Sequence, residues 1–81
     1  MEGERAMLSE RMIVAPSAGT FRPAAFEPGH QIEAGSVVGY VEGPGSSIEV
    51  VSPFHGQVQG YLAHPGERLR TGEHIAWLRV S

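Results

Sequence analysis

The 81-residue sequence contains no cysteine, lysine, aspartate or asparagine, and only 7% of its residues are aromatic. Without cysteine, the chain forms neither a disulfide nor a thiolate metal site. Its six basic residues are all arginine, and the formal net charge is −3. An acidic chain with no basic run is not expected to bind nucleic acid or an anionic membrane surface.

Long hydrophobic runs are also missing, since no apolar stretch approaches the roughly 18 residues that a membrane span needs. The start, Met-Glu-Gly-Glu-Arg, is acidic and is followed by no hydrophobic segment, so it does not look like a secretory signal. We therefore expect a cytoplasmic protein with a flexible segment over residues 1–10 and one domain over residues 11–81.

The clearest positive feature of the sequence is an internal repeat. Residues 13–41 are echoed by residues 50–78 at a constant offset of 37 (50 minus 13), without a gap. The repeated turn residues are Pro16/Pro53, Gly19/Gly56, Pro28/Pro65, Gly29/Gly66 and Gly35/Gly72, and the repeated apolar residues are Ile13/Val50, Phe21/Val58, Ile32/Leu69, Val38/Ile75 and Val41/Leu78. Such a repeat indicates one supersecondary unit used twice, each copy unable to bury its apolar face alone.

Each copy predicts four short strands separated by Pro and Gly turns. The expected strands are 11–15, 20–26, a short one at Ile32 and 37–42, then 48–52, 57–63, a short one at Leu69 and 74–80. With 11 Gly and 6 Pro spread along the chain, a long helix has no room. Pro23 indicates an edge position for its strand, because proline cannot donate a ladder hydrogen bond.

Two small sheets packed face to face would share one core. We expect that core to contain Ile13, Phe21, Ile32, Val38, Tyr40, Val50, Val58, Leu69, Ile75 and Trp77. Tyr40 and Trp77 occupy equivalent places in the two copies, which favours a core role for both over a ligand platform.

A specific resemblance rests on the ordered set of turns. The pattern Ala15-Pro16-x-x-Gly19, Pro28-Gly29, Ile32, Gly35-x-x-Val38-x-x-Val41-Glu42, Ser52-Pro53-x-x-Gly56, Pro65-Gly66, Leu69, Gly72-x-x-Ile75 resembles the biotinyl/lipoyl attachment domain family over about residues 12–80. The resemblance implies an all-β fold, a flattened β-barrel or barrel-sandwich hybrid of two quasi-symmetric four-stranded halves. It also implies a lysine at the tip of the hairpin that joins the halves.

Counting from the flanking motifs places that family lysine at Gly45. Gly43, Pro44, Gly45 and Ser46 stand where biotin carriers have Ala-Met-Lys-Met or a similar stretch. Biotin and lipoate are joined to a lysine amine, and this chain has no lysine. We therefore expect a degenerate attachment site that holds no cofactor, on a hairpin tip rebuilt from good turn residues.

Other polar residues are interpreted as structural or solvated. Ser46 and Ser47 could accept a phosphate or phosphopantetheine group, but we interpret them as turn residues that hydrogen-bond their own backbone. An acyl-carrier-type site would be followed by a helix, and none is expected here. The four histidines, His30, His55, His64 and His74, have no metal-ligand spacing. Glu42 and Glu49 are expected to be solvent-facing hairpin charges, and Arg68 and Arg70 with Glu67 and Glu73 a solvated turn region. We predict no catalytic residue and no metal site.

Three functions from different classes remain open. The favoured one is a non-catalytic interaction or accessory subunit that docks on a carboxylase, an acyltransferase or another biosynthetic enzyme. The alternative is a small-molecule-binding or auxiliary enzyme subunit that uses the groove between the sheets or the Gly-Pro-Gly tip. An adaptor domain of an export system is the weakest, because the coiled-coil insertion between the halves is missing. Exposed strand edges also make a homodimer possible.

Overall fold

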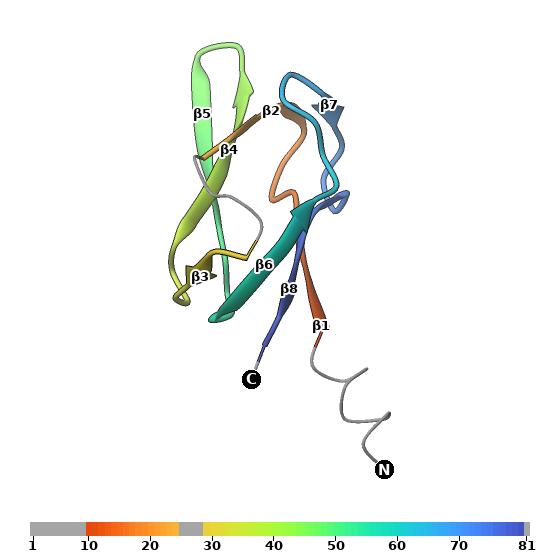
Figure 1. The fold of residues 1–81 in the computed structure, drawn as a ribbon. Helices are drawn as coiled ribbons and strands as arrows, with labels where there is room; N and C mark the ends of the chain where they lie inside the picture. The colour runs from red at the N-terminus through yellow and green to blue at the C-terminus, as the bar shows by residue number, and fades with distance from the viewer. Residues whose placement is uncertain (1–9, 25–28, 81) are drawn as a thin grey trace.

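The fold consists of two four-stranded antiparallel sheets, seen here in a computed structural model that describes residues 10–24 and 29–80 (Figure 1). The strands are β1 (Glu10–Val14), β2 (Gly19–Pro23), β3 (Gln31–Ile32), β4 (Val37–Gly43), β5 (Ser46–Val51), β6 (Gly56–Tyr61), β7 (Arg68–Leu69) and β8 (His74–Arg79). One sheet has the order β1-β8-β6-β3 and the other β5-β4-β2-β7. The expected all-β, flattened barrel-sandwich architecture is confirmed. No helix in the described ranges is long and apolar enough to cross a membrane.

The two copies of the repeat are interlocked, since each sheet takes two strands from each copy. The pairing Arg11↔Leu78 between β1 and β8 recurs, shifted by one repeat, as Ile48↔Val41 between β5 and β4. Loop hydrogen bonds repeat in the same way, because the Ala15 amide donates to the Glu73 carbonyl and the Ser52 amide to the Ser36 carbonyl. The repeat in the sequence is therefore a repeat of backbone geometry.

A β-bulge in each half decides which side chains enter the core. In β4 the register shifts between Val37 and Gly39, and β8 has the equivalent shift. Val38 and Val41 are consequently both buried, three positions apart, instead of following strict alternation. The buried apolar residues are Ile13, Ala15, Phe21, Ile32, Val38, Val41, Val50, Val58, Ala63, Leu69, Ile75, Ala76 and Leu78.

The bulges also overturn part of the predicted core. Tyr40 and Trp77 are predicted in the core but are only half-buried, although strict alternation from Val38 and Ile75 would place them inside. Beyond each bulge the parity of the strand is reversed, so both rings lie on the outer faces of the sheets. The other eight predicted core residues are buried.

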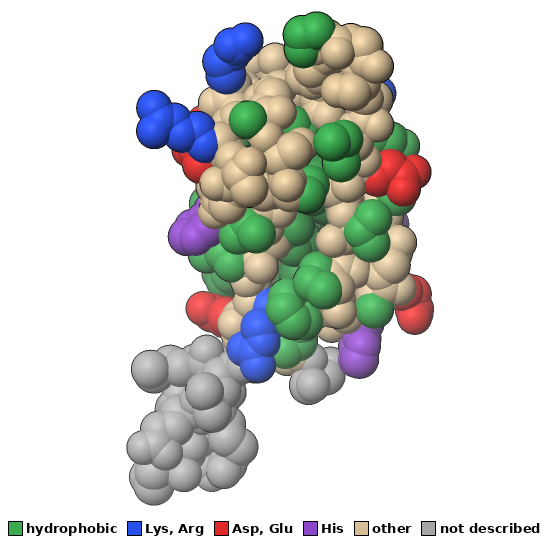
Figure 2. Space-filling view, turned by 180° about the vertical axis from the view of Figure 1, so that it is seen from behind, with side chains coloured by type: hydrophobic (Ala, Val, Ile, Leu, Met, Phe, Trp, Pro, Cys, Tyr) green, Lys and Arg blue, Asp and Glu red, His purple; other side chains and the backbone are tan. Residues whose placement is uncertain are grey.

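Some apolar side chains stay at the surface, and Figure 2 shows them along the middle of one face with charged groups nearer its rim. The large exposed ones are Met12, Val14, Ile48, Val51 and Leu62.

Pro23 is accommodated at the end of β2 and not on an edge strand, which corrects the expectation from sequence. β2 lies between β4 and β7, and Pro23 pairs with Gly39 of β4. The two-residue β7 pairs with Gly19 and Thr20, so among the described residues no ladder partner faces Pro23 on that side. The expected extension of this strand to residue 26 falls on residues 25–28, outside the described part of the chain. β1 begins at Glu10, and the rest of the 1–10 segment is also outside it.

Two equivalent glycines allow backbones to approach closely. A Cβ atom at Gly19 would lie 2.6 Å from the carbonyl oxygen of Glu42, and one at Gly56 would lie 2.6 Å from that of Arg79. Both contacts are with backbone, which cannot rotate away. The repeated glycine is therefore required by packing, and at Gly56 by packing without a positive φ.

Tyr61 links the two sheets. Its hydroxyl donates a 2.7 Å hydrogen bond to the Val38 carbonyl of the opposite sheet, and its ring lies 5.9 Å from that of Phe21. Burial raises the pKa of the Tyr61 hydroxyl above its ordinary value, because the phenolate would be poorly solvated there.

Gly56→Ala is expected to destabilise the domain by about 1–3 kcal/mol, because the added methyl group forces the β6 and β8 backbones apart. Gly60→Ala on the same strand is the matched control, since its Cβ would meet no atom closer than 3.8 Å. Urea unfolding of the two variants measures the difference. Equal stabilities would show that the close approach at Gly56 is not needed.

Tyr61→Phe is expected to cost about 0.5–1.5 kcal/mol near pH 7, because the hydrogen bond to Val38 is lost. The raised pKa means that the stabilisation by Tyr61 is complete below pH ~10 and is lost as pH rises through its native pKa. The gap between wild type and variant should therefore close in alkaline solution. Tyr40→Phe, whose hydroxyl has no hydrogen bond to described residues, is the control; a constant gap would contradict the assignment.

Candidate functional site

The hairpin of β4 and β5 ends in a two-residue turn at the position where the sequence places the degenerate attachment site. Gly43 pairs with Ser46, and Pro44 and Gly45 close the turn. Gly43 is half-buried, whereas the other three tip residues are exposed. Ser46 and Ser47 begin β5, so they are strand residues and not the N-terminus of a helix.

The turn has a defined backbone geometry. Gly45 has φ of 71°, whereas proline fixes the φ of Pro44 near about −65°. A negative φ followed by a positive one is the pattern of a type II turn. Gly43 lies in the regular strand β4 and has no positive φ.

The space around Gly45 is open. A Cβ atom built there meets no atom within 4 Å, so a longer side chain would extend into solvent. What the tip lacks is therefore reactive chemistry and not room. None of its four residues carries an amine, a carboxylate or an imidazole.

Arg22 contacts both Glu42 and Tyr40 beside the hairpin. Its guanidinium donates to the Glu42 carboxylate at 2.9 Å and lies 4.7 Å from the centroid of the Tyr40 ring. Across the ladder, Glu42 pairs with Ser47, and Glu49 pairs with Tyr40. The two glutamates therefore lie diagonally to each other on neighbouring strands. Glu42 is thus neutralised by Arg22. Sequence reasoning missed this cluster, because only the register of β2 on β4 brings Arg22 to Tyr40.

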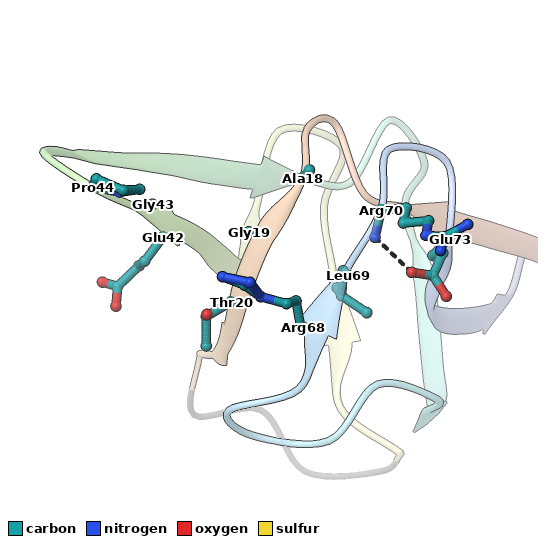
Figure 3. Close-up of a pocket in the computed structure, with 10 residues that line it drawn as sticks. All are labelled: Ala18, Gly19, Thr20, Glu42, Gly43, Pro44, Arg68, Leu69, Arg70 and Glu73. Carbon is teal, nitrogen blue, oxygen red and sulfur yellow. Dashed lines mark hydrogen bonds between the residues drawn. The ribbon is translucent and has the colours of Figure 1, made fainter.

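A groove lies beneath the hairpin tip, between the end of β4 and the turn after β7 (Figure 3). Its walls are formed by Ala18, Gly19, Thr20, Glu42, Gly43, Pro44, Arg68, Leu69, Arg70 and Glu73. Glu73 accepts a hydrogen bond of 2.5 Å from the Arg70 amide and so closes its own turn. The guanidinium groups of Arg68 and Arg70 have no ion pair with any described residue.

The neighbouring acid Glu67 also closes a turn. Its carboxylate accepts the His64 amide at 2.8 Å and lies 3.4 Å from the His64 ring nitrogen Nδ1. This backbone hydrogen bond lowers the pKa of Glu67 below its ordinary value. The predicted solvated turn region therefore consists of two acids that cap turns and two arginines that project from the groove.

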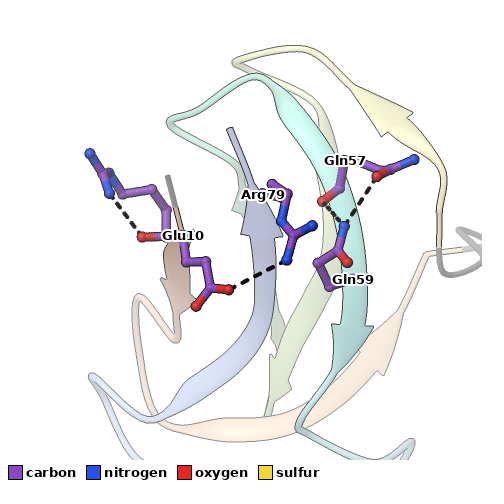
Figure 4. Close-up of polar contacts among 5 residues, drawn as sticks. Glu10, Gln57, Gln59 and Arg79 are labelled. Atoms are coloured by element: carbon purple, nitrogen blue, oxygen red, sulfur yellow. Dashed lines mark hydrogen bonds and ion pairs between the residues drawn. The ribbon is translucent and has the colours of Figure 1, made fainter. Parts of the chain in front are cut away.

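The equivalent corner of the other sheet holds an ion pair and two glutamines (Figure 4). Arg79, the repeat partner of Glu42, lies 3.7 Å from the Glu10 carboxylate. Gln59 donates to the Gln57 carbonyl at 3.2 Å, and Gln57 donates to the Gly29 carbonyl at 3.2 Å. The two ends of the domain therefore differ in chemistry although their backbones correspond.

The remaining candidates are not brought together. Among residues 10–24 and 29–80, no three His or Glu side chains are grouped so that they could hold a metal ion. His55 lies on the surface with Arg11, Pro53, Phe54 and Val80 around a shallow depression.

The chain resembles regions of several longer proteins of known structure. A search of curated proteins found no match. Among solved structures, the chain resembles a single-chain, multi-domain long-chain acyl-CoA carboxylase, with a TM-score of 0.80 and 22% identity over 90% of this chain and 7% of that one. Urea carboxylase from Kluyveromyces lactis gives a TM-score of 0.76 and 24% identity, over 85% of this chain and 6% of that one.

A third similar structure is an aspartoacylase family protein from Mesorhizobium loti, with a TM-score of 0.73 and 25% identity over 86% of this chain and 25% of that one. The chain thus spans only a small part of each of these longer proteins. Residues 11–78 match the biotin/lipoyl domain family described as biotin-requiring enzyme. Since this match covers nearly all of the domain, the chain belongs to the biotin/lipoyl domain family.

Proposed function

We propose that this chain is a biotin carrier-like domain that cannot be biotinylated or lipoylated. We further propose that it acts without catalysis, as a docking or accessory subunit of an acyl-transfer or carboxylase-type enzyme system. The observation that carries this proposal is the β4–β5 tip, which is exposed and sterically open at Gly45 but has no amine.

The chemistry of attachment explains the first half of the proposal. A ligase joins biotin or lipoate to the family's lysine through an amide bond, and that step needs a side-chain amine. Arginine is no substitute, because its guanidinium stays protonated in proteins. With no lysine in the sequence, neither the tip nor any other position offers the required side chain.

The docking role is supported by the remaining features of the domain. The two sheets, the interlocked halves and the projecting hairpin are retained without the attachment residue. Carboxylases and an aspartoacylase family protein contain a region of this shape within much longer chains. A domain that keeps the carrier surface can still be recognised by an enzyme that binds such carriers, whereas the fold alone does not name that enzyme.

A second candidate is a small-molecule site in the groove beneath the tip. Arg68 and Arg70 line the groove and have no ion pair with described residues, and Thr20 lies on its wall. Both acids of the groove are already engaged, Glu42 by Arg22 and Glu73 by the Arg70 amide. Among the described residues, the two guanidinium groups outnumber Glu73, the one carboxylate of the groove without an arginine side chain as its partner, and this excess of positive charge favours a ligand with a carboxylate or phosphate group.

Gly45→Lys is expected to become a substrate for a biotin ligase, whereas the natural chain keeps its unmodified mass under the same conditions. The lysine would project into open space, although the positive φ costs roughly 1–2 kcal/mol. Intact-mass spectrometry after incubation with ligase, ATP and biotin measures the product. Gly45→Arg is the control, with the same charge and no acylatable amine.

The outcomes of that experiment separate the two parts of the proposal. Labelling of the natural chain would contradict the claim that it lacks an attachment residue. A folded Gly45→Lys variant that stays unlabelled would contradict the retained carrier surface, and with it the docking role.

The groove candidate predicts that malonate or inorganic phosphate raises the midpoint of thermal unfolding. Arg68→Gln combined with Arg70→Gln should abolish the shift, because the cationic partners of the anion are removed. Arg79→Gln is the control, since Arg79 lies in the other sheet beside Glu10. An equal shift in all three proteins would identify a general salt effect and exclude this site.

A further inference from the structure

The two sheets have four edge strands, and they differ in how well their free edges are protected. β3 and β7 contain only two residues each, so they offer little unpaired backbone. β1 has five residues and β5 has six. A long free edge attracts another strand unless charges, proline or a bulge protect it.

β1 is protected by charged side chains. Glu10 and Arg11 are its first two residues, and the Arg11 guanidinium donates to the Glu10 carbonyl at 2.8 Å. The Glu10 carboxylate lies 3.7 Å from Arg79 on the neighbouring strand.

β5 is the equivalent strand of the other half, and it has little of this protection. It contains no proline, lysine or arginine, and Glu49 is its only charge. Five of its six residues are exposed, and the side chains of Ile48 and Val51 are 41% and 43% exposed. Within the described ranges, its outer edge has no strand partner.

The hairpin determines which backbone groups point outward. The turn is closed by the pair Gly43↔Ser46, and the ladder continues through Glu42↔Ser47 and Val41↔Ile48. Hydrogen-bonded and non-hydrogen-bonded pairs alternate along an antiparallel ladder, and a two-residue turn begins with a hydrogen-bonded pair. The amide and carbonyl groups of Ser47 and Glu49 are therefore directed to the free edge.

We propose that β5 pairs antiparallel with β5 of a second copy of this chain, about a two-fold axis at Ile48. This register sets Ile48 against Ile48 of the second copy and lets Ser47 exchange backbone hydrogen bonds with Glu49 of that copy. Centring on Glu49 would instead oppose two carboxylates, which is unfavourable. The strand is thus self-complementary in this register, as a two-fold interface requires.

The proposal goes beyond the accessory role and does not depend on it. Pairing of the two β5 edges would join two four-stranded sheets into one and bury the exposed Ile48 side chains against each other. Since each chain carries a net charge of −3, added salt should strengthen the association by screening the repulsion between copies.

Sedimentation equilibrium over a wide range of protein concentration tests this pairing. The wild type should change from the monomer mass to the dimer mass, and Ile48→Lys should remain monomeric because two ammonium groups would meet at the axis. Met12→Lys on β1 is the matched control, because Met12 is 41% exposed, as Ile48 is. It should dimerise like the wild type.

A wild type that stays monomeric at every concentration would overturn the proposal. The proposal would also be overturned if Met12→Lys lost the dimer and Ile48→Lys kept it, because the interface would then lie on β1. If Ile48→Lys does not fold, hydrogen exchange of the wild type decides. The amides of Ser47 and Glu49 should become protected as concentration rises, and unchanged exchange at both would refute the pairing.

Discussion

The pairing of strands between the two copies of the repeat is the constraint on which the rest of the structure depends. Among the residues that the structure describes, four of the six strand pairings join one copy to the other, namely β1–β8, β3–β6, β2–β7 and β4–β5. Neither copy can therefore complete a sheet alone, and the core forms only when both are in place. Gly19 and Gly56 serve the two remaining pairings, β2–β4 and β6–β8, because a Cβ atom at either position would meet the backbone of the neighbouring strand.

The same constraint explains how the hairpin tip keeps its length without the attachment chemistry. β4 ends the first copy and β5 begins the second, so their ladder is itself one of the pairings that hold the halves together. A change of length in the turn would disturb that register, whereas a side chain at Gly45 would meet no atom of the described residues within 4 Å and would carry only the strain of the positive φ. The geometry of the tip is thus maintained by folding, and its chemistry is free to differ.

Much of this could be predicted from sequence, because the repeat, the strands and the turn residues are local signals. The exceptions have physical causes. Tyr40 and Trp77 are predicted in the core but lie outside it, because β4 and β8 each contain a bulge, which the sequence pattern does not reveal. The Arg22–Glu42–Tyr40 cluster and the groove with Arg68 and Arg70 depend on which strands become neighbours, which no single strand reveals.

The account is tested most directly by purifying the chain from its native host and measuring its intact mass together with the proteins that remain bound. We expect the unmodified mass and a stoichiometric enzyme partner of the carboxylase, acyltransferase or related biosynthetic type. A covalently attached biotin or lipoyl group would contradict the account of the tip. Recovery of the unmodified chain with no enzyme partner would contradict the docking role.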